Sequence, residues 1–378
     1  PPVSTARHPR DRVDPNVWCD RAAVGSGHVG VSATTARKPH FLDAGATRRR
    51  YSLHMDLSVL IPTYRRPDKL RRCLESLAGQ RTAARFEIIV GVDGGDGAPT
   101  SSDIPESIRS AVRVEQFPKI GYIAVRRRML HSARGRLLLS LNDDVEAAPD
   151  LVQRHIEAHA SGLRVIGGSA TWKPVDSPTL FDQLVQQTNL IFFAPPSDRP
   201  PTYRDCYGLN MSVPTSLARD HGGFPDILDA YGYDDIELAY RLIWAGATLA
   251  LVPDAGVVHD HRYAPSDVLR REYLLGRSAW TYAGINPDFA RDLFGRDIRD
   301  RAELDHAERF LERERRDAMR LQSRFLALAE TPPLPIGAAA AATLAALTDS
   351  WVLLKRYLWR QGLLAASRNE PNQWSLLT

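Results

Sequence analysis

Short apolar runs alternate with amphipathic segments through the first half of the chain. The runs are too short for helices and have the length of buried strands. They cover residues 57–61, 86–92, 112–115 and 137–141. Between them, residues 67–79 and 122–133 repeat apolar side chains at the spacing of a helix face. Strands that alternate with helices predict a parallel α/β sheet with crossover helices.

The alternation is less regular from residue 150 to residue 265. Residues 150–160 are predicted to form a helix, and residues 165–168 to form a strand. Residues 181–193 are apolar and fit either a helix or a strand. A further strand is expected at residues 249–258, with a break at Pro253-Asp254.

Residues 266–378 have a helical pattern. Charged residues surround the apolar positions of 297–329, whereas 336–364 is rich in Ala and Leu. Asp349 and Lys355 interrupt the second segment, so it does not read as a transmembrane helix. Two interpretations remain: helices that pack or mediate homo-oligomerisation, which is the commoner role of such a stripe, or peripheral contact with a membrane.

The strand predicted at 137–141 ends in Asn142-Asp143-Asp144. Two adjacent carboxylates repel each other, which raises their pKa values unless a cation lies between them. Carboxylate oxygens suit Mg²⁺ or Mn²⁺, and Mg²⁺ often binds through carboxylates together with substrate phosphates. Thr63 and Asp93 follow two other predicted strands, so these loops are expected to meet at one ligand-binding edge of the sheet. A solvated turn or a helix N-cap is the alternative interpretation of the paired aspartates.

Composition narrows the class of protein. Of 378 residues, 43% are hydrophobic and 25% are charged, as in an ordinary globular protein. The net charge of +4 is spread over many arginines, which suits an anionic nucleotide or phospholipid better than nucleic acid. Cys19, Cys73 and Cys206 form no paired motif, so we expect a cytoplasmic location, including the inner face of a membrane, and no structural zinc.

Residues 1–54 differ from the rest of the chain. They lack hydrophobic periodicity and contain no apolar run long enough for a signal sequence. We expect a disordered arm that is dispensable for activity, with Met55 as the functional start.

Three segments carry a family resemblance. They read LSVLIPTYRRPDKLRRCLESLAGQ, EIIVGVDGG and GYIAVRRRMLHSARGRLLLSLNDD. In order and spacing, they resemble the nucleotide-binding half of family-two glycosyltransferases with the GT-A fold. The resemblance implies a GT-A-type, Rossmann-like mixed sheet flanked by helices in residues 55–265. Its nucleotide-binding half would be 55–150 and its acceptor half 151–265.

The resemblance also implies a donor site. The residues expected to bind the nucleotide are Pro62, Thr63, Tyr64, Arg65, Asp93, Arg126, Asn142 and Asp143. Arg65 would lie near the phosphates, and Asp144 would bind the metal. The chain departs from the family pattern at Asn142, where Asp is commoner, and at Arg127, where the family usually has Asn.

Two later motifs add the remaining chemistry. Asp234-Asp235 opens a predicted helix, where acidic residues also serve simply to complement the helix dipole. By resemblance, Asp235 is the general base and Asp234 binds the acceptor. His259 would complete the metal site, with His261 as the alternate, because side chains two residues apart in a strand share a face.

Two further residues, Trp172 and Asn210, are assigned to the acceptor site. A buried, hydrogen-bonded amide is the alternative for Asn210.

Together these residues predict a metal-dependent, inverting glycosyltransferase. The donor would be a nucleoside-diphosphate sugar, of the UDP or dTDP type by resemblance, and the acceptor a glycan, a lipid-linked molecule or a small molecule. Two alternatives stay open. A nucleotidyltransferase on a similar sheet would need no base helix followed by a metal-binding histidine, and a non-catalytic nucleotide-sugar-binding or scaffold protein would tolerate loss of Asp235.

Overall fold

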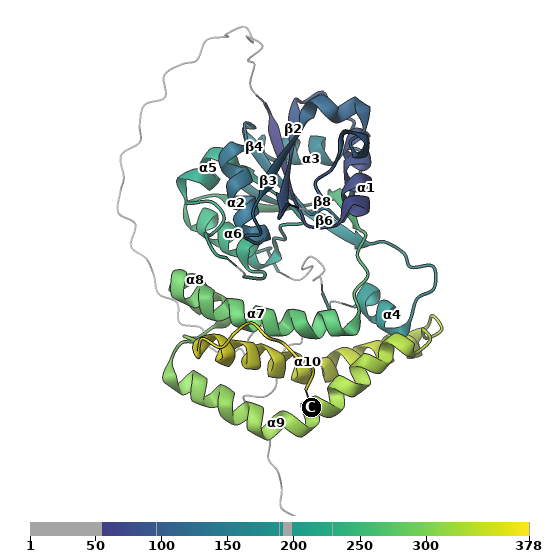
Figure 1. Cartoon of the computed structure of the whole chain (residues 1–378), viewed down its shortest axis with the longest axis vertical. Coiled ribbons are helices and arrows are strands. Elements are labelled where there is room, and N and C mark those ends of the chain that lie inside the picture. Colours follow the sequence, from purple (N-terminus) through teal and green to yellow (C-terminus); the bar gives the residue numbers. More distant parts are fainter. Residues whose placement is uncertain (1–54, 96, 189, 192–198, 229, 378) are drawn as a thin grey trace, which may run out of the picture.

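The structure is a computed structural model that describes residues 55–377 except 96, 189, 192–198 and 229. The arm expected at residues 1–54 lies outside the described residues. A sheet with its helices forms the upper part of the molecule in Figure 1, and long helices lie beneath it.

One mixed sheet forms the centre of the upper part. Its strands in the described chain are β1 (Leu57–Thr63), β2 (Phe86–Asp93), β3 (Val112–Phe117), β4 (Leu137–Leu141), β5 (Val145–Ala147), β6 (Arg164–Trp172), β7 (Asn210–Pro214) and β8 (Thr248–His259). Their order across the sheet is β3-β2-β1-β4-β7-β6-β8-β5.

The central strands are parallel and fully buried. Every residue of β1 and β4 is buried, because helices cover both faces of the sheet. β1 pairs in parallel with both β2 and β4, whereas β7 pairs antiparallel with β4. The predicted GT-A-type mixed sheet with flanking helices is therefore confirmed.

The break predicted in the last strand occurs as a bulge. Gly168 pairs with Val252 and Ser169 with Gly256, so residues 253–255 of β8 have no partner in β6. Beyond the bulge, β8 pairs with β5, and this antiparallel register brings His259 opposite Val145. The three-residue strand β5 is absent from the sequence prediction because it is too short to show a period.

Helices cover the sheet and continue below it. In the described part of the chain they are α1 (Pro67–Ala78), α2 (Tyr122–Ser132), α3 (Leu151–Ala158), α4 (Leu180–Gln187), α5 (Thr215–Asp220), α6 (Asp234–Trp244), α7 (Pro265–Ile285), α8 (Pro287–Phe294), α9 (Arg301–Ala327) and α10 (Ala338–Ser367). The apolar segment that fitted either a helix or a strand begins as the helix α4, and its last two residues, 192 and 193, lie outside the described residues.

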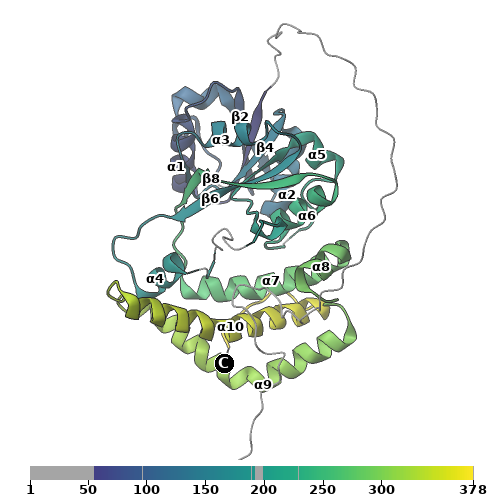
Figure 2. The same cartoon turned by 180° about the vertical axis from the view of Figure 1, so that it is seen from behind.

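The C-terminal helices share a hydrophobic core with the sheet. Leu60 of β1 and Leu238 of α6 belong to the same buried cluster as Tyr282 of α7, Phe289 of α8 and Trp359 of α10. Figure 2, seen from behind, has α7 between the sheet and α10, with α9 outermost. Apolar burial thus joins the helical region to the sheet. No helix in the described part of the chain has the length and apolar composition of a membrane span.

Helices α7 and α10 touch along their backbones at two glycines. A Cβ at Gly276 would lie 1.9 Å from the carbonyl oxygen of Trp359, and one at Gly362 would lie 1.9 Å from that of Tyr273. Any side chain at either position would force the helices apart.

We expect Gly362→Ala to lower the free energy of unfolding by about 1–3 kcal/mol, the usual cost of overpacking. The added methyl group would collide with the backbone of Tyr273. Urea unfolding followed by circular dichroism measures the change. Gly95→Ala is the control, since a Cβ there meets no described atom within 4 Å. Equal stability of the two variants would contradict so close a helix crossing.

Candidate active site

The loop after β1 begins the site. The hydroxyl group of Thr63 donates a hydrogen bond of 2.7 Å to Asp143. Arg65 adopts a left-handed backbone with φ of 52°, and its guanidinium lies 5.2 Å from the Tyr64 ring centroid. The next residue, Arg66, places Nη1 2.9 Å from Asp144 and 3.4 Å from Asp143. Arg66, the neighbour of the predicted Arg65, therefore reaches the paired aspartates.

Asp93, at the end of β2, is held by the loop that precedes α2. Its side chain is buried and accepts hydrogen bonds from the backbone amides of Ile120, at 2.7 Å, and Gly121, at 3.1 Å. Lys119 forms an ion pair with the same carboxylate, and its ammonium group lies 3.8 Å from the Tyr64 ring centroid. Tyr64, Asp93 and Lys119 thus form one wall of the site.

Asn142, Asp143 and Asp144 follow β4 as predicted, and each faces different partners. The amide oxygen of Asn142 accepts a hydrogen bond of 2.7 Å from Arg126. Burial, reinforced by the charge of Asp144, raises the pKa of Asp143 to about 6. Burial would also raise the pKa of Asp144, but hydrogen bonds from His259 and His261 outweigh it and hold that pKa below its ordinary value.

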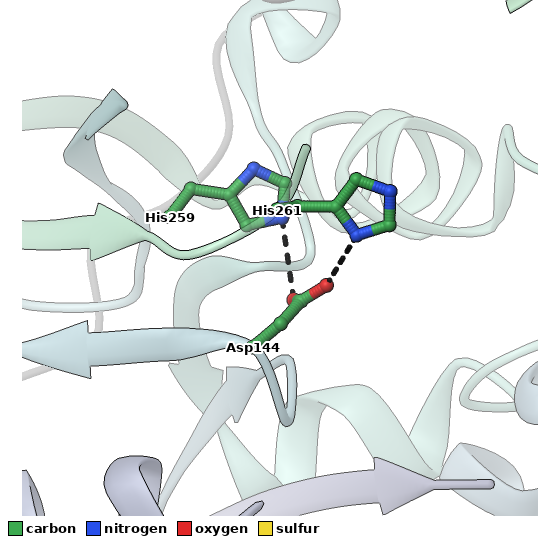
Figure 3. A group of neighbouring side chains, drawn as sticks. All are labelled: Asp144, His259 and His261. Atoms are coloured by element: carbon green, nitrogen blue, oxygen red, sulfur yellow. Dashed lines mark hydrogen bonds and ion pairs between the residues drawn. The ribbon is translucent and has the colours of Figure 1, made fainter. Parts of the chain in front are cut away.

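Asp144, His259 and His261 gather at the end of β8 (Figure 3). Nε2 of His259 lies 3.2 Å from Oδ1 of Asp144, and Nδ1 of His261 lies 2.9 Å from Oδ2. The two imidazole rings stack with centroids 5.5 Å apart. Both histidines therefore face the same carboxylate, as their spacing along the strand predicts.

The donor set of these three residues fits a divalent cation. One ligand atom from each lies within 4.8 Å of the others, and Asp144 and His259 are buried. A carboxylate and two imidazoles are ligands for divalent transition metals, whereas Mg²⁺ prefers a shell of oxygen atoms.

Arg126 connects the paired aspartates of β4 to the start of α6. Its guanidinium is buried, pairs with Asp234 at 2.9 Å and donates to Asn142 and to the carbonyl oxygen of Gly208. The hydroxyl group of Tyr122 donates to the other oxygen of Asp234 at 3.0 Å. Both oxygens of Asp234 thus accept hydrogen bonds from the protein, and Arg126 links the predicted donor and acceptor sides.

Asp235 lies beside this network, and its hydrogen-bond partners among the described residues are backbone amides. Its carboxylate accepts hydrogen bonds from the amides of Gly208, at 2.7 Å, and Ile236, at 2.8 Å. Burial, together with the charge of Asp234, raises the pKa of Asp235 to about 6. A carboxylate with such a pKa is ionised at neutral pH and is basic enough to accept a proton.

These side chains line one cleft of about 800 Å³. The predicted residues on its wall are Pro62, Thr63, Tyr64, Asp93, Arg126, Asn142, Asp143, Asp144, Asp234, Asp235 and His259. Residues of the C-terminal region, among them Arg271 of α7 and Asn372, complete the lining.

Two residues predicted to contact the acceptor lie behind the cleft. The amide group of Asn210 donates to the carbonyl oxygens of Ser169 and Ala255 and accepts from His155 at 2.8 Å. Asn210 therefore resembles the buried, hydrogen-bonded amide of the alternative interpretation. Trp172 packs beside His259, with ring centroids 5.1 Å apart, so it contacts a predicted metal ligand.

Several cleft residues were not predicted from the sequence: Arg66, Lys119, Tyr122 and Arg271. Arg66 was overlooked because the backbone turn at Arg65, which decides which arginine points inward, leaves no pattern in the sequence. Lys119 follows β3, so the rule that ligands gather at the carboxyl ends of strands would have indicated it. Tyr122 and Arg271 belong to helices whose pairing the sequence does not reveal.

Comparison with known structures identifies the fold. The structure is similar to that of the mannosyltransferase PcManGT from Pyrobaculum calidifontis in complex with GDP-Man and Mn²⁺. The TM-score is 0.52 at 18% identity, over 85% of this chain and 89% of that chain. The sheet, its flanking helices and this likeness show a GT-A-type fold.

Sequence comparison supports the family resemblance. Residues 58–220 match the profile Glycosyl transferase family 2, the family that the sequence motifs resemble. The validoxylamine A glucosyltransferase of Streptomyces hygroscopicus subsp. jinggangensis (strain 5008) is 29% identical over 49% of this chain and 51% of its own length. The pre-mycofactocin glycosyltransferase of Mycobacterium tuberculosis (strain ATCC 25618 / H37Rv) is 27% identical over 62% and 49%. The chain thus spans about half the length of these two relatives.

We expect Arg126→Met to destabilise the protein by about 3–5 kcal/mol, because it leaves the carboxylate of Asp234 buried without its cation. Denaturant unfolding measures the loss. Arg128→Met is the matched control on the same helix: Arg128 is exposed and has no ion pair among the described residues. If both variants unfolded at the same denaturant concentration, the buried network would not be a structural link.

Proposed function

We propose that the protein transfers a sugar from a nucleoside-diphosphate sugar to a hydroxyl group of an acceptor. The observation that carries this proposal is the convergence of two kinds of group on one cleft. Asp144, His259 and His261 offer a cation site, and Asp235 offers a base with a raised pKa. The match of residues 58–220 to the profile of glycosyl transferase family 2 supports the reaction class.

The donor would bind along the carboxyl ends of β1, β2 and β4. Tyr64 and Asp93 would hold the nucleoside, with Thr63 keeping Asp143 in place. Arg66, which lies beside two carboxylates, would also bind the diphosphate of the donor. A divalent cation at Asp144, His259 and His261 would neutralise the charge that develops on the leaving diphosphate.

On the acceptor side, Asp235 would act as the general base. It would take the proton from the attacking hydroxyl group while that oxygen bonds to the anomeric carbon. The bond from the anomeric carbon to the nucleoside diphosphate breaks on the opposite side, so the configuration inverts. The amides of Gly208 and Ile236 hold the Asp235 carboxylate without neutralising it, which suits this role.

The two imidazoles favour Mn²⁺ over Mg²⁺, since Mg²⁺ seldom takes nitrogen ligands. The similar mannosyltransferase structure contains Mn²⁺ with GDP-Man, which supports the same choice. For this chain, a donor of the UDP or dTDP type stays a prediction. GDP sugars serve as the comparison in the binding experiment. The acceptor, the cytoplasmic location, homo-oligomerisation and membrane contact also stay predictions.

We expect binding of one nucleoside diphosphate to depend on the cation. Calorimetric titration of UDP, dTDP and GDP, each with Mn²⁺, with Mg²⁺ and with EDTA, measures this. His259→Ala should abolish the gain in affinity that Mn²⁺ gives. His221→Ala is the control, because that exposed histidine is remote from the Asp144 group.

Each result of this titration has a distinct meaning. Binding that is equal in EDTA and in Mn²⁺ would contradict the cation site but leave a metal-independent transferase. Absence of binding by every nucleotide would contradict the proposed donor and favour a protein without transferase activity.

We expect Asp235→Asn to reduce kcat by about a hundred- to ten-thousandfold, the range that general base catalysis contributes. Donor affinity should stay unchanged, which calorimetry checks. In the unsubstituted protein, turnover should fall as the pH drops below about 6, because Asp235 becomes protonated there. Asp220→Asn, an exposed aspartate at the end of α5, is the control. Full turnover by Asp235→Asn would exclude it as the base.

A further inference from the structure

The base helix α6 begins from a strained residue. Tyr233, which directly precedes Asp234 and Asp235, has a left-handed backbone with φ of 65°. A bulky residue other than glycine keeps this conformation only where its surroundings enforce it. The carbonyl oxygen of Tyr233 accepts the amide of Glu237 at 2.8 Å, so this residue sets the first turn of α6.

Side chains from the C-terminal helices surround Tyr233. Its ring meets Tyr282 of α7 and Phe294 of α8 edge to face, with centroids 5.8 Å apart in both cases. Tyr282 and Phe294 are fully buried, and Tyr233 is 5% exposed. The conformation before the Asp-Asp pair is therefore enforced by helices that follow it in the sequence.

Trp359 of α10 adds a directional contact to this aromatic cluster. Its indole N–H donates a hydrogen bond of 3.2 Å to the hydroxyl group of Tyr233. Its ring lies 5.4 Å from that of Phe294, and its side chain is buried. The contact joins residues 126 positions apart in the sequence.

The backbone of Trp359 is itself fixed. Its carbonyl oxygen lies 1.9 Å from the position that a Cβ of Gly276 would take, so the backbone of α10 contacts α7 directly at this residue. The indole is consequently presented to Tyr233 from a rigid crossing of two helices. Hydrogen-bond geometry held in this way orients its partner better than packing alone.

We propose that Trp359 is a positioning residue for Asp235, acting through Tyr233. The inference rests on the proposed function for its effect on turnover, but not for its effect on the start of α6. The indole N–H holds the Tyr233 side chain, the strained backbone of Tyr233 sets the first turn of α6, and that turn aims the carboxylate of Asp235 into the cleft. The helical region beyond the family profile is thereby part of the catalytic apparatus.

Three variants and one control test this link in the full-length chain. Trp359→Phe keeps an aromatic ring and removes the N–H donor, Tyr233→Phe removes the acceptor, and the double variant removes both. Trp351→Phe is the control on the same helix. Trp351 is buried against Phe325, with ring centroids 4.2 Å apart, and its indole N–H has no partner among the described residues.

Hydrogen exchange in peptides covering residues 231–244, measured by mass spectrometry, reports how stable the start of α6 is. This measurement needs no substrate. We expect exchange there to rise about five- to tenfold in Trp359→Phe and Tyr233→Phe, the factor that corresponds to one neutral hydrogen bond. The double variant should rise no further, and Trp351→Phe should exchange like the unsubstituted protein. Unchanged exchange in Trp359→Phe, or fully additive effects in the double variant, would overturn the link.

The second measurement is turnover of the nucleotide sugar that the unsubstituted protein uses best. We expect Trp359→Phe to lower kcat by a similar factor while the dissociation constant of the nucleoside diphosphate stays the same. A loss of donor affinity with unchanged kcat would overturn the positioning of Asp235. If the unsubstituted protein turned over no nucleotide sugar, the proposed function would fail, and the exchange measurement alone would decide whether Trp359 sets the start of α6.

Discussion

Repulsion among carboxylates is the constraint on which the cleft depends. Besides the exposed Asp267, five aspartates line it: Asp93, Asp143, Asp144, Asp234 and Asp235. Burial makes each of them costly to ionise, so each needs a compensating partner. Lys119 pairs with Asp93, Arg66 with Asp143 and Arg126 with Asp234. Two histidines face Asp144. Asp235 accepts hydrogen bonds from backbone amides instead, and burial together with the charge of Asp234 outweighs them and raises its pKa.

The same compensation ties the two sides of the cleft together. Arg126 pairs with Asp234 at the start of α6 and donates to Asn142 after β4. A buried guanidinium with fixed partners resists displacement, because any shift would leave a carboxylate or an amide unsatisfied. The start of the base helix and the paired aspartates therefore keep their relative position before any substrate binds.

The sequence was most informative where a local run of similar residues is enough to predict the structure. Leu137–Leu141 predicts a buried strand, and the polar residues after it indicate a ligand edge, because both follow from local pattern and sheet geometry. It was less informative where a single dihedral angle, or a partner distant in the sequence, determines the local structure. The φ of Arg65 turns Arg66 inward, and the antiparallel direction of β7 depends on the chain returning from the other side of the sheet.

Long-range packing explains what else the sequence left open. Helical periodicity located α7 and α10 but not their crossing, because Gly276 and Gly362 read as ordinary helix-weakening residues until the two backbones are seen in contact. Asn210 illustrates the reverse difficulty. Its place beside a functional motif suggested a role with substrate, yet His155 and two carbonyl oxygens use its amide group.

The residues of the proposed site fall in two parts of the chain. The family profile ends at residue 220, and it includes the loops for the nucleotide and the paired aspartates. Asp235, His259 and His261 come afterwards, and so do the helices that close the cleft. The proposed base and two of the proposed cation ligands therefore depend on packing outside the segment that the profile matches. Under the proposed function, the close contact of α10 with α7 would serve the chemistry as well as stability.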